Sequence, residues 1–176
     1  MELGHVFQES IFSNFLICYM VKGKGLAMKK ISYIENLERW MGEFDFYIPI
    51  KVRFSETDMF GHLNNTVPFI YFEQARIELI NRLGVWDDWR KGEVEYIPIV
   101  ADLQCDYLAQ VFFGEELKVY VKVADVGRSS VDLHYMAKKA DGTLCLTGRG
   151  TLVKINRKTG KSEPWTEEER RMMEKG

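Results

Sequence analysis

Cysteine is scarce in this sequence, and histidine, proline and net charge are in short supply as well. Only Cys18, Cys105 and Cys145 occur among 176 residues, and an odd, widely spaced set argues against a disulfide framework or a paired-cysteine metal site. The three histidines form no cluster with the spacing of metal ligands, so we expect no metal. A net charge of −2 provides no basic footprint for nucleic acid.

Long apolar runs are missing too. The apolar stretch over residues 11–21 is too short to span a bilayer. It also lacks the preceding basic residues and the cleavage site of a signal peptide. We therefore expect a cytoplasmic protein with no membrane segment. Met28 is a candidate start of translation, because the sequence that follows it is more typical of a folded domain.

The composition that is present suits one domain with a real core. Hydrophobic residues make up 46% of the chain and charged residues 28%, as in ordinary soluble proteins. Residues 1–45 read as an N-terminal extension in which the apolar spacing over 31–42 predicts a short helix. The main domain is expected over 46–164. Thr166 and Glu169 form a capping-box pattern that predicts a terminal helix within 165–176.

Alternating apolar residues predict a strand over 46–54, in which Pro49 favours an edge position. A helix is expected over 65–83, and its first half is apolar on all sides, which is typical of a helix enclosed by protein. Four more strands are predicted, over 97–107, 117–123, 131–137 and 144–155, with a hairpin at Asp141-Gly142. This order predicts an α+β fold, a curved antiparallel sheet wrapped around one long central helix.

The junction between the first strand and the long helix carries the residues with chemical potential. It reads Arg53-Phe-Ser-Glu-Thr-Asp58-Met-Phe-Gly61-His62-Leu-Asn64-Asn65. A helix start has unsatisfied N–H groups and the positive end of the helix dipole. A nearby carboxylate and such an amide would supply a nucleophile or base and an oxyanion site, which suits attack on a carbonyl. The structural alternative is that Asp58 caps a turn or the helix.

The motif Thr57-Asp58-x-x-Gly61-His62-x-Asn64-Asn65, followed by Phe72-Glu73-Gln-Ala75-Arg76, resembles the hotdog-fold acyl-CoA thioesterases. The 4-hydroxybenzoyl-CoA thioesterase-like branch is the most similar. The Gly127-Arg128-Ser129-Ser130 turn and the Asp141-Gly142 hairpin extend the resemblance over residues 46–164. It implies hydrolysis of an acyl-CoA to a free acid and CoA without a metal or organic cofactor. It also implies a homodimer or homotetramer that holds the substrate between protomers.

The resemblance assigns catalysis to Asp58 and the oxyanion contact to the backbone N–H of about Asn65. A second branch of the family uses a helix glutamate, and Glu73 fits that place, so two carboxylates compete for one role. Glu73 could instead pair with Arg76, three residues further along the helix. His62 is a candidate for substrate binding or for holding the loop by hydrogen bonds.

Arg128, Ser129 and Ser130 are candidates for binding the phosphates or pantetheine arm of CoA, against the alternative of a plain turn. Three rival functions stay open. One is another hotdog enzyme, such as a dehydratase acting on acyl thioesters. Another is a non-catalytic acyl-CoA-binding or sensing domain, and the third is a thioesterase that takes its acyl group from an acyl-carrier protein. The acyl group itself is not predicted.

Overall fold

The computed structural model describes residues 31–85 and 95–176. The chain divides into two compact units, Met1–Ile34 and Glu35–Gly176, and all the helices and strands named below lie in the second unit. Its elements, in chain order, are α2 (Leu37–Gly42), β1 (Tyr47–Lys51), the short 3₁₀ helix η2 (Phe54–Glu56), α3 (Val67–Leu83), β2 (Tyr96–Tyr107), β3 (Glu116–Val126), β4 (Ser130–Lys139), β5 (Leu144–Asn156) and α4 (Glu167–Met173). None of the helices in the described ranges is long and apolar enough to cross a membrane.

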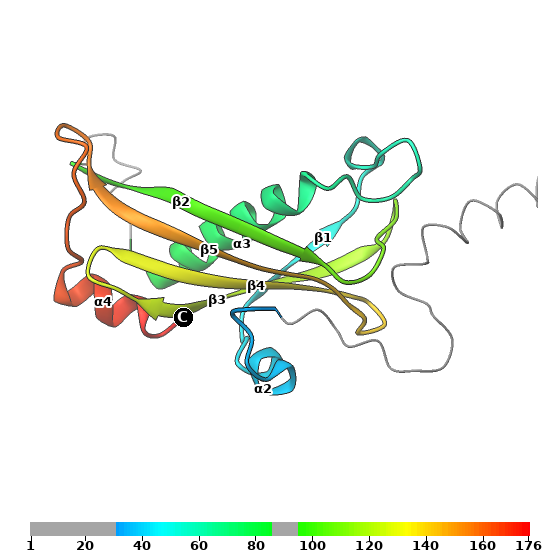
Figure 1. The fold of residues 1–176 in the computed structure, drawn as a ribbon, viewed down its shortest axis with the longest axis horizontal. Helices are drawn as coiled ribbons and strands as arrows, with labels where there is room; N and C mark the ends of the chain where they lie inside the picture. The colour runs from blue at the N-terminus through cyan, green and yellow to red at the C-terminus, as the bar shows by residue number, and fades with distance from the viewer. Residues whose placement is uncertain (1–30, 86–94) are drawn as a thin grey trace, which may run out of the picture. The chain divides into compact units, whose positions relative to one another are not determined.

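The five strands form one antiparallel sheet in the order β1-β3-β4-β5-β2. Register shifts within the β2–β5, β3–β4 and β4–β5 pairs mark bulges or irregularities, which increase the local twist and bend a sheet. Helix α3 lies along one face of the curved sheet (Figure 1). The predicted α+β hotdog architecture is confirmed. Pro49 lies in β1, an edge strand as expected.

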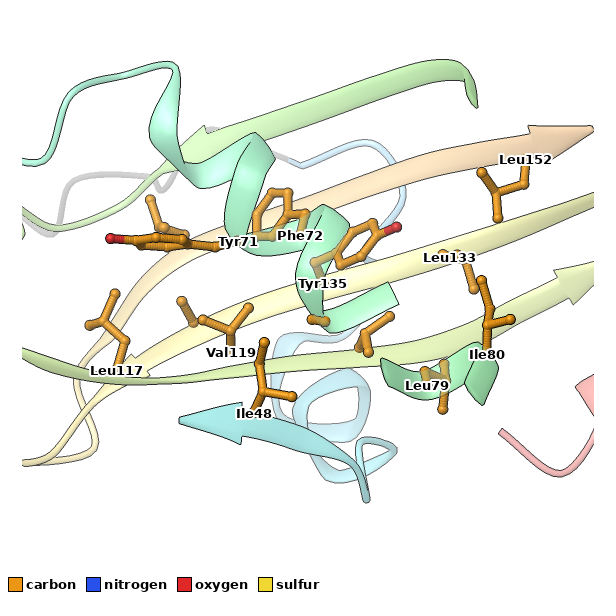
Figure 2. Packing of buried hydrophobic residues seen from close by; sticks show 14 of the residues in the cluster. Ile48, Tyr71, Phe72, Leu79, Ile80, Leu117, Val119, Leu133, Tyr135 and Leu152 are labelled. Carbon is orange, nitrogen blue, oxygen red and sulfur yellow. The ribbon is translucent and has the colours of Figure 1, made fainter. Parts of the chain in front are cut away.

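The core lies between α3 and the sheet, and aromatic side chains fill its centre (Figure 2). Phe72 on α3 stacks on Tyr135 of β4, with ring centroids 4.6 Å apart. Gly148 on β5 makes room for this stack, because a Cβ atom there would lie 2.5 Å from the Phe72 ring and 2.7 Å from the Gln104 carbonyl. Gly148 therefore allows α3 and β2 to approach β5 closely. Cys145 is fully buried in this core.

One expectation about α3 is wrong for the single protomer. The sheet covers only one side of the helix, so its first half is not enclosed. Ile70 is 59% exposed and Ile77 is 36% exposed, and Glu73 lies between them on the same helical face. The all-round apolar sequence reflects a second side of α3 that this chain alone leaves uncovered.

Both short helices are fixed by their caps. Asn36 accepts a hydrogen bond from the Arg39 N–H at 2.9 Å, so α2 starts at Leu37 and is shorter than the predicted helix. Thr166 and Glu169 form the predicted capping box of α4. The Arg170 guanidinium donates to the Val126 and Gly127 carbonyls at the end of β3.

The two ends of the sheet carry different parts of the predicted site. The loop between η2 and α3 lies at one end, and α4 lies at the other (Figure 1). Val52, just before that loop, exchanges hydrogen bonds with Gly114 and Glu115, immediately before β3. The Gly127–Ser130 turn follows the far end of β3. Eleven residues of extended strand separate the two ends by about 35 Å.

Candidate functional site

The loop from Thr57 to Asn64 is closed on itself by backbone hydrogen bonds. The Asp58 N–H donates to the His62 carbonyl at 2.8 Å, and the Asn64 N–H donates to the Glu56 carbonyl at 2.9 Å. Gly61 adopts a φ of +79°, which favours glycine and allows the tight reversal. A further bond from the Leu63 N–H to the Val111 carbonyl, 2.7 Å long, fixes the loop beside the segment before β3.

Asp58 uses one carboxylate oxygen to hold this loop. Its Oδ1 atom accepts the Phe60 N–H at 2.8 Å and the His62 N–H at 3.1 Å. Within the part of the chain that the structure describes, no residue binds Oδ2. The turn-capping alternative is therefore correct for one oxygen, and the half-buried side chain keeps the other available to a substrate.

The start of α3 offers an amide next to this loop. The Asn64 side chain accepts hydrogen bonds from the Thr66 N–H at 3.1 Å and the Thr66 hydroxyl at 2.9 Å, which fixes the turn before the helix, whose N-cap is Thr66. The Asn65 N–H has no acceptor among the residues described. Helix α3 starts two residues later, and its dipole adds positive potential here. This amide is a donor of the kind that stabilises an oxyanion.

Tyr107, at the end of the edge strand β2, holds the backbone carbonyl of Asn65 in place. Its hydroxyl donates to the Asn65 carbonyl. Partial burial, with Cys105 nearby, raises the pKa of Tyr107 to about 12. The hydroxyl therefore stays protonated and continues to donate at neutral pH. The sequence offered no sign of this contact, because Tyr107 lies 42 residues away and fits an ordinary strand pattern.

Glu56 is a second carboxylate that sequence reasoning missed. Its Oε2 atom accepts the Tyr71 hydroxyl at 2.8 Å and the Arg53 N–H at 2.7 Å, and its Oε1 atom contacts the Arg53 guanidinium at 3.0 and 3.1 Å. Burial alone would raise the pKa of Glu56, but these donors hold it below its usual value. Burial and the Glu56 charge raise the pKa of Tyr71.

His62 lies within the loop with its ring against Phe112, the centroids 5.0 Å apart. Its Nε2 atom is buried and has no hydrogen-bond partner among the described residues. Around the loop, large apolar side chains are exposed, which marks a binding or assembly surface. They are Phe54, Met59, Phe60, Phe112 and Phe113.

Glu73 is placed differently from Asp58. Its side chain is 63% exposed on the uncovered face of α3, and Arg76 is 4.0 Å away. The predicted pairing with Arg76 is therefore present, though long. The burial that would have made this acid an unusual base is absent in the single protomer. Across the described residues, no three His, Cys, Asp or Glu side chains gather as metal ligands would.

The Gly127–Ser130 turn lies at the other end of the sheet from Asp58, so one protomer does not bring the predicted residues together. The carbonyls of Arg128 and Ser130 accept hydrogen bonds from the backbone and indole N–H groups of Trp165, each at 2.9 Å. The Arg128 side chain is exposed, and Ser129 and Ser130 are half-buried. The guanidinium is thus the group of this turn best placed for an anion.

Comparisons with known proteins agree on one family. A family model for the thioesterase-like superfamily matches residues 52–172. The uncharacterized protein YsmA of Bacillus subtilis strain 168 is 43% identical over 144 residues, which cover 81% of this chain and 95% of YsmA.

Two solved structures carry the same fold. The DHNA-CoA thioesterase of Staphylococcus aureus is 27% identical with a TM-score of 0.66, covering 73% of this chain and 88% of that one. A thioesterase of Thermus thermophilus, solved in complex with coenzyme A and Zn, is 31% identical with a TM-score of 0.63. That match covers 73% of this chain and 91% of the other.

Proposed function

We propose that this chain, which belongs to the thioesterase-like superfamily, hydrolyses an acyl-CoA thioester to a free acid and CoA. The observation that carries the proposal is the pairing of an available carboxylate oxygen on Asp58 with the unbound Asn65 N–H at the start of α3. Asp58 either attacks the thioester carbonyl to form an anhydride or activates a water. The Asn65 amide stabilises the oxyanion, and one such donor is typically worth about 10²–10³ in rate.

We further propose that the active form is a homodimer built on strand β2, alone or as half of a homotetramer. The two sheet edges differ in length, because β1 has five residues whereas β2 has twelve, and β2 has no protein neighbour on its outer side among the described residues. Ile99 and Val100 on β2 are exposed. A long, apolar open edge is a template for pairing with a second chain.

Antiparallel pairing of two β2 strands would complete the site. Tyr107, at the end of β2, contacts the Asp58 end of the fold, while the start of β2 lies beside the end of β5, near the Gly127–Ser130 turn. A two-fold axis through β2 therefore brings the turn of one protomer to the Asp58 end of its partner. In this arrangement Arg128, with Ser129 and Ser130, binds CoA phosphates across the interface, and the His62 Nε2 atom faces the substrate.

Two features support a CoA ester in the cytoplasm as the working context. The relatives solved as thioesterases include one with coenzyme A bound, and Cys105 and Cys145 are both free thiols, as in a reducing compartment. Glu73 remains the second candidate acid. It lies on the α3 face that dimerisation would cover, so a role for it requires the partner.

The test is release of CoA from a panel of acyl-CoAs of varied length and ring content, followed by mass spectrometry. We expect hydrolysis by the wild type, loss of it in Asp58→Asn, and retention in Glu73→Gln. The reverse pattern would transfer the catalytic role to Glu73. Binding without turnover across the panel would favour a sensing domain, and turnover only of acyl-carrier-protein esters would change the substrate class.

A mixing experiment tests the shared site. Asp58→Asn and Arg128→Ala homodimers are each expected to be impaired, by loss of chemistry and by a raised KM. After subunit exchange, half of the dimers are mixed and each mixed dimer has one intact site, so roughly one quarter of wild-type activity returns. No recovery, despite exchange shown by mass spectrometry, would contradict a site made from two protomers.

A further inference from the structure

We infer that Glu56 is a positioning residue, whose carboxylate ties the Asp58 loop to helix α3 through the Tyr71 hydroxyl. The inference rests on the proposed function for its kinetic meaning, although the tether itself is a property of the fold. Glu56 is neither the nucleophile nor the oxyanion donor. Its role is to hold both of those groups in register.

The tip of the loop needs such a tether, because only the later loop residues His62 and Leu63 pack against other parts of the protein. Met59 is 90% exposed and Phe60 is 68% exposed, so the tip of the loop buries almost no apolar surface. Its position depends on hydrogen bonds instead. Most of these bonds are internal to the loop, such as those that Asp58 Oδ1 accepts, and they shape the loop without fixing it to α3.

Glu56 links the loop to the rest of the protein from a sheltered position. Its side chain is only 11% exposed. It accepts hydrogen bonds from the N–H and guanidinium of Arg53, which follows β1. It also accepts one from the hydroxyl of Tyr71 on α3, 15 residues after Glu56. Tyr71 is itself buried. In Figure 2 its hydroxyl points the opposite way from that of Tyr135, out of the apolar core.

Glu56 is also connected through the backbone to both reacting groups, the Asp58 carboxylate and the Asn65 amide. Asp58 follows Glu56 by two positions. The Glu56 carbonyl accepts the Asn64 N–H at 2.9 Å, and the proposed oxyanion donor is the next amide, that of Asn65. Movement of Glu56 therefore shifts the carboxylate and the amide together relative to α3. Misplacing reacting groups by about 1 Å can reduce a rate by as much as about 10²-fold.

The experiment compares Tyr71→Phe, which removes only the tethering hydroxyl, with Tyr135→Phe as the matched control. Tyr135 is an equally buried tyrosine, and its hydroxyl contacts Arg76 at 3.4 Å, away from the loop. For Tyr71→Phe we expect kcat to fall about 10-fold with KM within about 2-fold, because binding groups stay while alignment is lost. Tyr135→Phe should keep the wild-type kcat, even if it lowers the melting temperature.

Two further measurements separate positioning from loss of stability. In an Asp58→Asn background, Tyr71→Phe should cause a clearly smaller additional loss than in the wild type, since only the alignment of the Asn65 amide is left to lose; a fully additive loss would overturn the inference. Amide hydrogen exchange at His62 and Asn64 should accelerate in Tyr71→Phe and not in Tyr135→Phe. Unchanged exchange and unchanged kcat in Tyr71→Phe would also overturn it, while leaving the proposed hydrolysis intact.

The exchange measurement needs no substrate. If the wild type hydrolyses no thioester, the proposed function fails, and faster exchange in Tyr71→Phe still supports Glu56 as the anchor of the loop. Glu56→Gln adds a check on charge, because the amide oxygen can still accept from Tyr71 while the pairing with Arg53 weakens. A milder kinetic defect than that of Tyr71→Phe would support the hydroxyl contact as the critical part, and a more severe defect would contradict it.

Discussion

Acid should destabilise this protein through a single buried histidine on the sheet face opposite α3. His134 on β4 accepts a hydrogen bond from the Trp40 indole N–H at its Nδ1 atom, 2.9 Å away. Burial is the main reason that the pKa of His134 falls from 6.5 to about 4. The positive charges of Lys122 and Arg149 lower it further, whereas Asp132, 3.7 Å from Nε2, and Glu43 oppose the shift.

The direction of the effect follows from which state binds the proton first. In the unfolded chain His134 is protonated below about pH 6.5, but in the folded protein it stays neutral until about pH 4. Between these values the unfolded state holds more protons, so the free energy of unfolding decreases as the pH falls. For a single site with these two pKa values, the loss between pH 7 and pH 4.5 is on the order of 2 kcal/mol. That corresponds to a drop in melting temperature of several degrees for a domain of this size.

The assay is urea unfolding of the wild type and His134→Gln at pH 7, 6, 5 and 4.5. Carboxylates also titrate toward the acid end, so the informative quantity is the difference between the two pH profiles. We expect the profile of His134→Gln to be flatter by about 2 kcal/mol between pH 7 and 4.5, whatever the variant's stability at pH 7. His62→Gln serves as a control for a histidine in the loop. Parallel profiles for the wild type and His134→Gln would refute the reasoning.

Three shorter predictions concern packing, capping and assembly. Gly148→Ala should lower the free energy of unfolding by about 2 kcal/mol or more, because the new Cβ meets the Gln104 carbonyl as well as the Phe72 ring. Denaturant unfolding measures this loss, and unchanged stability would contradict the close packing of β5 against β2 and α3. Thr166→Ala should cost about 1 kcal/mol through the α4 cap, and an unchanged unfolding midpoint would contradict this. Ile99→Lys on the open edge of β2 should give monomers by light scattering with little hydrolysis, whereas a stable dimer would exclude β2 as the interface.

Much of the fold could be predicted because local and tertiary signals agree. The alternating strands and the Asp141-Gly142 hairpin are features whose residues act within a few positions of each other. Where the local pattern was insufficient, the reason is that it does not tell which other segments cover a given side of an element. The first half of α3 is apolar all round, and the expectation of full enclosure failed because one protomer covers only one of its sides.

The candidate site could be predicted only in part for a similar reason. The Asp58 loop and the Asn64 turn are contiguous in sequence, so their motif could be recognised. The partners that fix them come from afar: Tyr71 reaches Glu56 across 15 residues and Tyr107 reaches Asn65 across 42. Tyr71 belongs to the apolar first half of the helix, which gives no sign of its hydrogen-bond partner. No periodic pattern reveals where a single hydroxyl will point.

The most direct test of the central claim is the single-turnover rate of Asp58→Asn on the acyl-CoA that the wild type hydrolyses best, measured with the affinity for CoA. Loss of the carboxylate should reduce the rate at least about 10³-fold, because the attacking oxygen or its base is gone. The affinity for CoA should stay within about 2-fold, since Asp58 Oδ1 shapes a loop that the asparagine oxygen can still hold. A rate within about 10-fold of the wild type would contradict the assignment of Asp58 as the catalytic nucleophile or base of this thioesterase fold.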